Sequence, residues 1–156
     1  MDISKHTHPD TLERYSFLWS EVRLLIAAVA LLLGGTPVLR FFIRVPALSG
    51  FIGTILKLTW ITSGLASLYL LYRWMEHGKK LFGKNETADT AAFFISVASG
   101  LNLGIVGLAG TNIGMSIAPS YSAFIITAAV YIMSARHLYE RWQSSGEKLF
   151  GLHHEL

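Results

Sequence analysis

The chain contains no cysteine among its 156 residues, which excludes disulfide frameworks, thiolate metal sites and cysteine nucleophiles. Charged residues are also scarce. Asp, Glu, Lys and Arg together make up 15% of the sequence, whereas soluble domains contain about 25%. Hydrophobic residues make up 52% of the chain, and the mean hydropathy is +0.45. This composition is typical of an integral membrane protein.

The charged residues that are present leave long gaps between them. Residues 90–135 form an uncharged run of 46 residues. As one helix, this run would be about 69 Å long at about 1.5 Å per residue, whereas about 20 apolar residues cross the hydrocarbon core of a bilayer. The run therefore predicts two crossings joined by a tight turn. Two further crossings are predicted by residues 24–39 and by residues 45–72, where Lys57 is the one charge.

We therefore predict an all-α integral membrane protein with four transmembrane helices. Gly and Pro residues at 34–38 should weaken the end of the first helix, and residues 112–120 should form the turn between the last two. Acidic residues precede the first apolar run, so a cleaved signal peptide is not expected. The expected helices comprise residues 16–39, 49–74, 90–111 and a last helix from about Pro119 to Trp142.

A short phrase occurs twice in the sequence. RWMEHGKKLFG at 73–83 and RWQSSGEKLFG at 141–151 agree at seven of eleven positions. In each copy, Arg and Trp would anchor a helix end at the membrane interface, Gly would end the helix, and Leu-Phe would turn along the membrane surface with its apolar side down. Chance convergence of common interfacial residues is the alternative to duplication. The predicted interfacial anchors are Trp19, Arg73, Trp74, Arg141 and Trp142.

We interpret the doubled phrase as an internal duplication that produces two parallel helical-hairpin repeats. The first repeat would comprise residues 16–83 and the second residues 84–151, with an N-terminal segment at 1–15 and a C-terminal tail at 152–156. Parallel repeats weakly disfavour a carrier of the inverted-repeat, alternating-access kind.

The charge distribution predicts the sidedness of the chain. With four crossings, ten of the Lys and Arg residues fall on the side of the termini, and three fall on the other side. The positive-inside rule then places both termini in the cytoplasm, in a cell membrane. All ten Asp and Glu residues also fall on the inner side in this interpretation. No span would contain an acid, which disfavours proton relay through Asp or Glu.

Three basic residues remain on the predicted outer side: Arg40, Arg44 and Lys57. They could form an anion site for a lipid phosphate, an acidic partner or an anionic solute. In the alternative interpretation, Arg40 and Arg44 only touch lipid headgroups, and the Lys57 ammonium reaches the interface along its flexible stem.

Small residues mark the third predicted helix. The spacing of its glycines places several of them on one face, where another backbone can approach closely. Asn102 lies on a different face, and its amide needs a partner within the hydrocarbon. The pattern predicts tight packing, either within the chain or between chains. The residues of this predicted packing or oligomerisation site are Gly100, Gly104, Gly107, Gly110, Gly114 and Asn102.

All six histidines fall on the predicted inner side. Metal binding, or a haem held between His77 and His137, is an alternative that the spacing does not favour, because it matches no compact ligand motif. No Walker loop, GxSxG elbow or HExxH motif occurs, and the residue sets for acid–base or nucleophilic catalysis are missing. We therefore predict no enzyme activity, no cofactor, no metal and no nucleic-acid partner.

Two functional hypotheses follow. The first is a non-enzymatic multi-pass membrane protein, acting as an oligomeric assembly or as an accessory or structural subunit of a membrane complex. Its partners would be the lipid bilayer and either other copies or other membrane subunits, contacted through the third helix. The alternative is a small oligomeric channel or facilitator for an ion or a small solute, which could be an anion. It is suggested by the acid-free outer half and by polar residues within the spans: Thr59, Thr62, Ser63, Ser96, Ser99 and Asn102.

Overall fold

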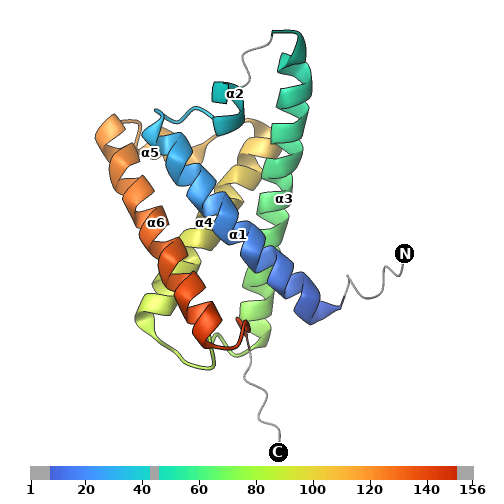
Figure 1. Cartoon of the computed structure of the whole chain (residues 1–156), viewed down its shortest axis with the longest axis vertical. Coiled ribbons are helices and arrows are strands. Elements are labelled where there is room, and N and C mark those ends of the chain that lie inside the picture. Colours follow the sequence, from blue (N-terminus) through green and yellow to red (C-terminus); the bar gives the residue numbers. More distant parts are fainter. Residues whose placement is uncertain (1–7, 43–45, 151–156) are drawn as a thin grey trace, which may run out of the picture.

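A computed structural model describes residues 8–42 and 46–150 of the chain (Figure 1). Within these residues the secondary structure is helical and contains no strand. The elements in chain order are α1 (Pro9–Leu32), α2 (Val38–Phe42), the short 3-10 helix η2 (Pro46–Leu48), α3 (Ser49–Glu76), α4 (Thr87–Ala109), α5 (Ile113–Ile117) and α6 (Tyr121–Ser144).

Three helical segments are long and apolar enough to cross a membrane, by length and composition: α1, the segment Pro46–Glu76 that contains α3, and α4. The prediction of an all-helical, membrane-embedded protein is confirmed to this extent. Helix α6 is also 24 residues long, but its second half contains Arg136, Glu140 and Arg141, so that it is less apolar than the other three.

Helix α1 lies seven residues earlier in the chain than the sequence pattern predicts. It begins at Pro9 rather than at residue 16 and ends at Leu32 rather than at residue 39. Proline is favoured in the first turn of a helix, where its missing N–H is not needed, and Asp10 in the same turn complements the helix dipole. Gly34 and Gly35 end the helical course with φ angles of +78° and +82°, a conformation that favours glycine.

The turn between α4 and α6 contains the short helix α5 and two side-chain caps. Gly110 closes α4 in the left-handed conformation, with φ of +74°. The Asn112 side chain accepts a hydrogen bond from the Met115 N–H at 3.0 Å, and Ser120 caps α6 by accepting from the Ala123 N–H. Helix α6 therefore starts after Ser120, and proline 119 precedes the helix instead of occupying its first turn as predicted.

The four long helices alternate in direction (Figure 1). Helices α1 and α4 run upward in that view, whereas α3 and α6 run downward. The most extensive contact joins α3 to α4, followed by the contact between α1 and α6. We call the end that carries α2 and α5 the upper end, and the opposite end, where α1 and α4 begin, the lower end.

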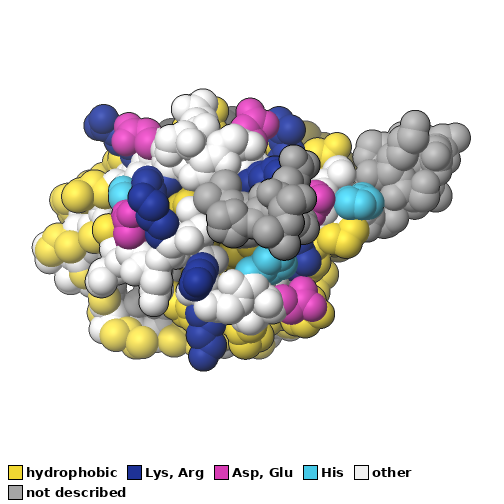
Figure 2. Space-filling view, turned by 90° about the horizontal axis from the view of Figure 1, so that it is seen from below, with side chains coloured by type: hydrophobic (Ala, Val, Ile, Leu, Met, Phe, Trp, Pro, Cys, Tyr) yellow, Lys and Arg dark blue, Asp and Glu magenta, His cyan; other side chains and the backbone are white. Residues whose placement is uncertain are grey.

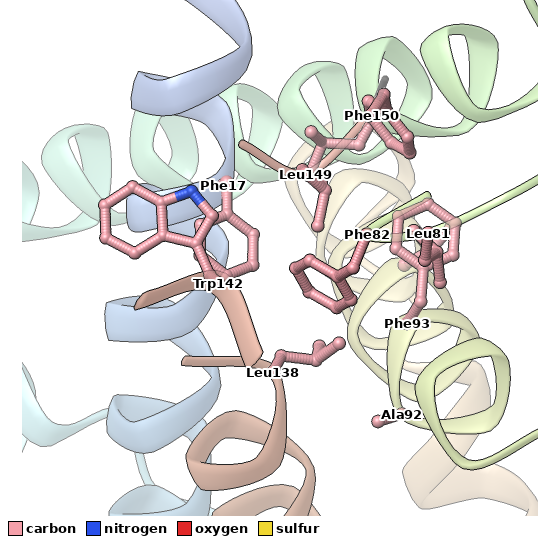
Figure 3. Packing of buried hydrophobic residues seen from close by; sticks show 11 residues of the cluster. Phe17, Leu81, Phe82, Ala92, Phe93, Leu138, Trp142, Leu149 and Phe150 are labelled. Atoms are coloured by element: carbon pink, nitrogen blue, oxygen red, sulfur yellow. The ribbon is translucent and has the colours of Figure 1, made fainter. Parts of the chain in front are cut away.

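The lower half is closed by a group of buried apolar side chains, which we call the lower cluster (Figure 3). Both copies of the doubled phrase contribute their Leu-Phe pair to it, and the Phe82 N–H donates to the Leu149 carbonyl at 2.8 Å. The expectation that these pairs turn along the membrane surface is therefore wrong. The cluster comprises Phe17, Leu70, Leu81, Phe82, Ala92, Phe93, Val97, Leu138, Trp142, Leu149 and Phe150.

The two copies of the phrase have the same local backbone conformation. Gly78 and Lys79 have φ angles of +66° and +62°, and Gly146 and Glu147 have +68° and +62°. In each copy, the residue after the glycine donates its N–H to the carbonyl of the phrase's tryptophan, at 3.0 Å in the first copy and 2.9 Å in the second. The same sequence pattern thus reverses the chain in the same way after α3 and after α6.

Charged and histidine side chains are spread over the lower face. Figure 2 shows Lys, Arg, Asp, Glu and His side chains gathered on this face, with hydrophobic side chains around it. This distribution is expected for helix ends that emerge from an apolar layer into water.

Candidate functional site

The upper half of the protein contains a chamber of about 700 Å³, which we call the upper chamber. Its size falls within the range of about 300–1,000 Å³ that small-molecule pockets occupy. All four long helices contribute to its walls, and α2 and α5 contribute at its upper end. Much of the wall is apolar, from side chains that include Ile26, Leu31, Ile55, Trp60 and Phe124.

Arg23 is the one charged side chain among the described residues that line the upper chamber. It comes from the middle of α1 and is only 4% exposed. Its Nη1 donates to the Ser99 hydroxyl at 3.2 Å, and its Nη2 donates to the Ser96 carbonyl at 2.8 Å. Both partners lie on α4, so these bonds fix the guanidinium between α1 and α4.

The hydrogen-bond partners of Arg23 in the described part of the chain include no carboxylate. No Asp or Glu oxygen in the described part of the chain lies within ion-pair distance of the guanidinium, and the buried Nε has no hydrogen-bond partner there. A guanidinium has five N–H donors in a fixed planar fork, which suits carboxylate, sulfate and phosphate oxygens. Arg23 is therefore the one side chain lining the upper chamber, among the described residues, whose charge suits an anion.

Glycine makes room for this arginine. A Cβ atom on Gly100 would lie 3.0 Å from the Arg23 Cζ and 1.9 Å from the Ser67 Oγ. A side chain at this position would therefore collide with α3 and displace the guanidinium. On the α3 side of the upper chamber, the Trp19 indole N–H donates to the Ser63 hydroxyl at 3.2 Å.

Glu21 is the second charged residue buried in the middle of α1. It is 5% exposed, and neither carboxylate oxygen has a hydrogen-bond partner among the described residues. The expectation that no span contains an acid is wrong for this residue. It depended on a helix beginning at residue 16, which would place Glu21 near the membrane interface. Because α1 begins at Pro9 instead, Glu21 lies near the middle of a candidate span.

Most of the predicted packing glycines of α4 face α3 of the same chain. The Cα of Gly64 lies 2.9 Å from where a Cβ of Gly104 would stand, and a Cβ of Gly107 would lie 3.0 Å from the Ile61 backbone nitrogen. Together with Gly100, these two residues line the contact between α3 and α4. This face is therefore occupied within the chain, which is the intramolecular alternative of the sequence analysis.

The other members of the predicted packing set lie at the upper turn. Gly110 ends α4, and a Cβ there would meet no atom of the described residues within 4 Å. The Asn102 amide donates to the Asn112 side chain at 3.0 Å and accepts from the Ile113 N–H at 2.9 Å. A Cβ on Gly114 would lie 3.6 Å from the Asn102 Nδ2. Asn102 thus finds its partners in the turn and holds α5 against α4.

The predicted outer basic residues lie at the upper end. A Cβ on Gly53 of α3 would lie 4.0 Å from the Arg40 Nη2, and Lys57 follows one helical turn later on the same face. Both side chains are exposed. They do not line the upper chamber, but their neighbours Leu39 and Leu56 do. Arg44 lies outside the described residues.

The predicted interfacial anchors divide between the two halves. Trp19 lines the upper chamber. The other four lie at the lower end, where Arg73 pairs with Glu13 of α1 at 3.1 Å and Arg141 pairs with Asp89 of α4 at 2.8 Å. There, Trp142 is buried in the lower cluster and Trp74 packs against it.

Two of the histidines considered as haem ligands hydrogen-bond to protein groups at the lower end. The His77 Nδ1 lies 2.8 Å from the Arg73 carbonyl, to which it can donate. The His137 Nε2 lies 2.7 Å from the Asp89 carboxylate, which accepts from it. The histidines at 6, 153 and 154 lie outside the described residues.

Sequence reasoning missed Glu21 and Arg23 as a site, although one signal could have found them. Pro9 followed by Asp10 is a typical helix start, and a helix counted from there places both residues in the middle of a span. The serine residues that surround Arg23 come from α3 and α4, so that no local pattern could have joined them to α1.

Comparisons with protein families, with curated proteins and with solved structures found nothing that matches this chain.

Proposed function

We propose that the protein is a four-helix bundle with four membrane spans, α6 being the fourth. Helix α6 is free of charge over residues 121–135, alternates in direction with its neighbours and packs against α1 and α4. The lower end, where Lys and Arg residues are most numerous, would face the cytoplasm by the positive-inside rule. The upper end would then face outward, and both termini would be cytoplasmic.

We further propose that this bundle binds an amphipathic anion in the upper chamber, as a facilitator for solutes of that class. One observation carries the proposal: Arg23 is the only charge that lines a mostly apolar chamber, and no carboxylate pairs with it in the described part of the chain. Charged side chains within spans are costly, and they generally mark functional sites. A ligand with one anionic group would neutralise Arg23, and an apolar body would fit the walls.

The charges at the upper end support the same ligand class. Lys57 and Arg40 lie close to the lining residues of α3 and α2, and all the described acidic residues except Glu21 lie toward the lower end. A region lined by charges of one sign raises the local concentration of the opposite ion. The upper end would therefore attract anions from the outer side.

A facilitator is better supported than an open pore. The lower cluster packs aromatic and aliphatic side chains in the lower half, beside a pocket of about 510 Å³ at the lower end. None of the residues that line the upper chamber belongs to the lower cluster. The chamber would thus be accessible from above and closed below. Transfer to the cytoplasmic side would require the lower cluster to open.

Binding can be measured on protein in nanodiscs of zwitterionic lipid. The probes are decanesulfonate, decanol and decyltrimethylammonium, which share a chain and differ in charge. Trp19 and Trp60 line the chamber, so that their fluorescence should report occupancy. We expect saturable binding of the sulfonate alone. Arg23→Gln should weaken it by about tenfold or more, because hydrogen bonds to charged groups contribute about 1.5–3 kcal/mol.

Arg136→Gln is the matched control, because this arginine is exposed on α6 and pairs with Glu140 in the next turn. It should leave binding unchanged. Equal signals from all three probes, or equal sulfonate affinity in wild type and Arg23→Gln, would show that the probe partitions only into lipid and would refute the proposal. Flux of the sulfonate into liposomes, compared between wild type and Lys57→Leu, then tests facilitation.

We also propose that the two helical hairpins are repeats. Supporting observations are the equal backbone conformation of both phrases and the equivalent partners of their arginines. Arg73 of α3 pairs with an acid near the start of α1, and Arg141 of α6 pairs with an acid near the start of α4. The contacts agree with this relation, since α1–α6 and α3–α4 are the two most extensive.

Assembly with other copies or with other membrane subunits is a second proposal. One observation favours it: the upper part of α3 extends past the other helices (Figure 1) and exposes 66% of Phe51 and 60% of Leu58. The glycines of α4 would not form such a contact, because α3 covers them. Native mass spectrometry in mild detergent tests this proposal, and a monomer without any co-purifying protein would contradict it.

A further inference from the structure

Glu21 is a buried acid that the proposed binding of anions does not use. It lies on α1 two residues before Arg23, which is about 3 Å along the helix axis. Its two carboxylate oxygens have no hydrogen-bond partner among the described residues, and it is not within ion-pair distance of Arg23. The two residues nevertheless interact electrostatically. Glu21 is thus a buried carboxyl group close to Arg23 along α1, on a different face of the helix and outside the lining of the upper chamber.

The charged groups around Glu21 are few. Arg23 lies two residues away on α1, and Tyr131 of α6 lines the upper chamber together with Arg23. The charged residues of α3 and α4 lie toward the helix ends, and those of α6 (Arg136, Glu140 and Arg141) lie in its lower half. At the lower end these are paired, as in Arg73 with Glu13 and Asp89 with Arg141. At the upper end they are Lys57 and, on α2, Arg40.

Charge balance in this region changes when an anion binds. At a pH where Glu21 is ionised in the empty protein, the charges of Glu21 and Arg23 sum to zero. A bound anion adds one negative charge next to a buried carboxylate, in an apolar environment where an uncompensated charge is costly. Uptake of one proton by Glu21 restores the balance, because the anion then pairs with Arg23 and the neutral carboxyl group remains.

We propose that Glu21 is a proton-binding site and that the upper chamber takes up one proton together with each amphipathic anion. This inference rests on the proposed binding of anions at Arg23. The proton and the anion bind to different residues, and no covalent bond changes other than the O–H bond that forms on Glu21. A facilitator with this site would couple the movement of its anion to that of a proton.

The coupling has a definite sign and size. Over the pH range in which Glu21 is ionised in the empty protein and protonated in the complex, the anion should bind more tightly as the pH falls. For one proton, the Kd should change by about tenfold per pH unit. Decanesulfonate is a suitable probe because its head group stays ionised, so that any pH dependence belongs to the protein.

Calorimetry of decanesulfonate binding to the full chain in nanodiscs measures the protons directly. In the pH range over which the wild-type Kd changes by about tenfold per pH unit, titrations in two buffers with different ionisation enthalpies should give close to one proton taken up per probe bound. Glu21→Gln should bind the probe without proton uptake and with an affinity that does not depend on pH. Glu147→Gln, which removes an exposed acid at the lower end, and His137→Gln should keep the wild-type uptake.

The outcomes separate this inference from the proposed function. Saturable binding that depends on Arg23 but takes up no proton in the wild type would overturn the role of Glu21 and leave the anion site in place. Uptake that persists in Glu21→Gln and disappears in His137→Gln would also overturn it. Absence of saturable binding in the wild type would refute the anion site, and the inference with it. The wild-type measurement decides even if Glu21→Gln does not fold.

Discussion

The contact between α3 and α4 depends on glycine at a point where two backbones nearly touch. A Cβ atom added to Gly104 would stand 2.9 Å from the Cα of Gly64, whereas carbon atoms are at their best separation at about 3.5–4.0 Å. A Gly104→Ala protein must therefore move the two helices apart by about 0.6–1.1 Å. The obstacle is backbone, so no side chain can rotate away to relieve it.

The cost of this separation can be estimated from the loss of packing. A gap of about 0.5–1 Å forfeits a quarter to a half of the dispersion attraction of each affected contact. Overpacked cores are usually destabilised by about 1–3 kcal/mol, and we expect Gly104→Ala to fall in this range. Because the α3–α4 contact is the most extensive in the protein, the change should lower the stability of the whole chain.

The assay is unfolding in lipid bicelles, followed by tryptophan fluorescence, with the oligomeric state measured on the same samples. Gly53→Ala is the matched control, since it also lies within a helix but a Cβ there would meet only Arg40, at 4.0 Å. We expect the control to be neutral or slightly stabilising, because alanine favours the helix by about 0.5–1 kcal/mol over glycine.

Two results would refute the reasoning. If Gly104→Ala were as stable as Gly53→Ala, the close approach of α3 and α4 would not exist in the membrane. If Gly104→Ala instead lost an oligomer that the wild type forms, and its monomer kept the wild-type stability, the glycine face would contact another chain rather than α3.

Three further predictions concern the two ends of the protein. Arg141→Met should cost about 1.5–3 kcal/mol of unfolding free energy, because a fully buried carboxylate of α4 loses its charged partner; Arg136→Met, which breaks an exposed pair, should cost little. Asn102→Leu should speed hydrogen exchange of residues 110–118 by at least tenfold, since the upper turn loses its contacts to α4; unchanged exchange would contradict this. Because the chain has no cysteine, single substitutions test the sidedness: a membrane-impermeant maleimide should label Ser116→Cys in intact cells and Lys148→Cys only after lysis, and the reverse pattern would contradict the proposed orientation.

The parts of the fold that depend on local sequence were predicted well. The helix α3 begins at Ser49 as expected, and α4 differs from its predicted bounds by two to three residues at each end. The start of α1 was missed because hydropathy increases gradually there. The first turns of α1 are already helical, but they lie at the lower end and expose polar side chains. The proline at position 9 was the better indicator of the helix start.

The candidate site was largely beyond prediction from sequence. Three of the predicted packing glycines, Gly100, Gly104 and Gly107, lie at the contact with α3, and Gly100 also makes space for a guanidinium from α1. That role requires knowledge of how α1 crosses α4. The outer basic residues were predicted as an anion site, whereas the arginine that lines the chamber was assigned to the inner surface.

The sequence by itself determined that this chain is helical and apolar enough to enter a membrane. The length of an uncharged run and the glycines at which a helix ends are both properties of consecutive residues. The tertiary structure alone decided that the upper half contains a half-open chamber and that buried apolar side chains gather in the lower half. The rotation and crossing of the helices select which side chains meet, and this selection brings Arg23 to the serines of α4. It also leaves Glu21 buried without a hydrogen-bond partner among the described residues.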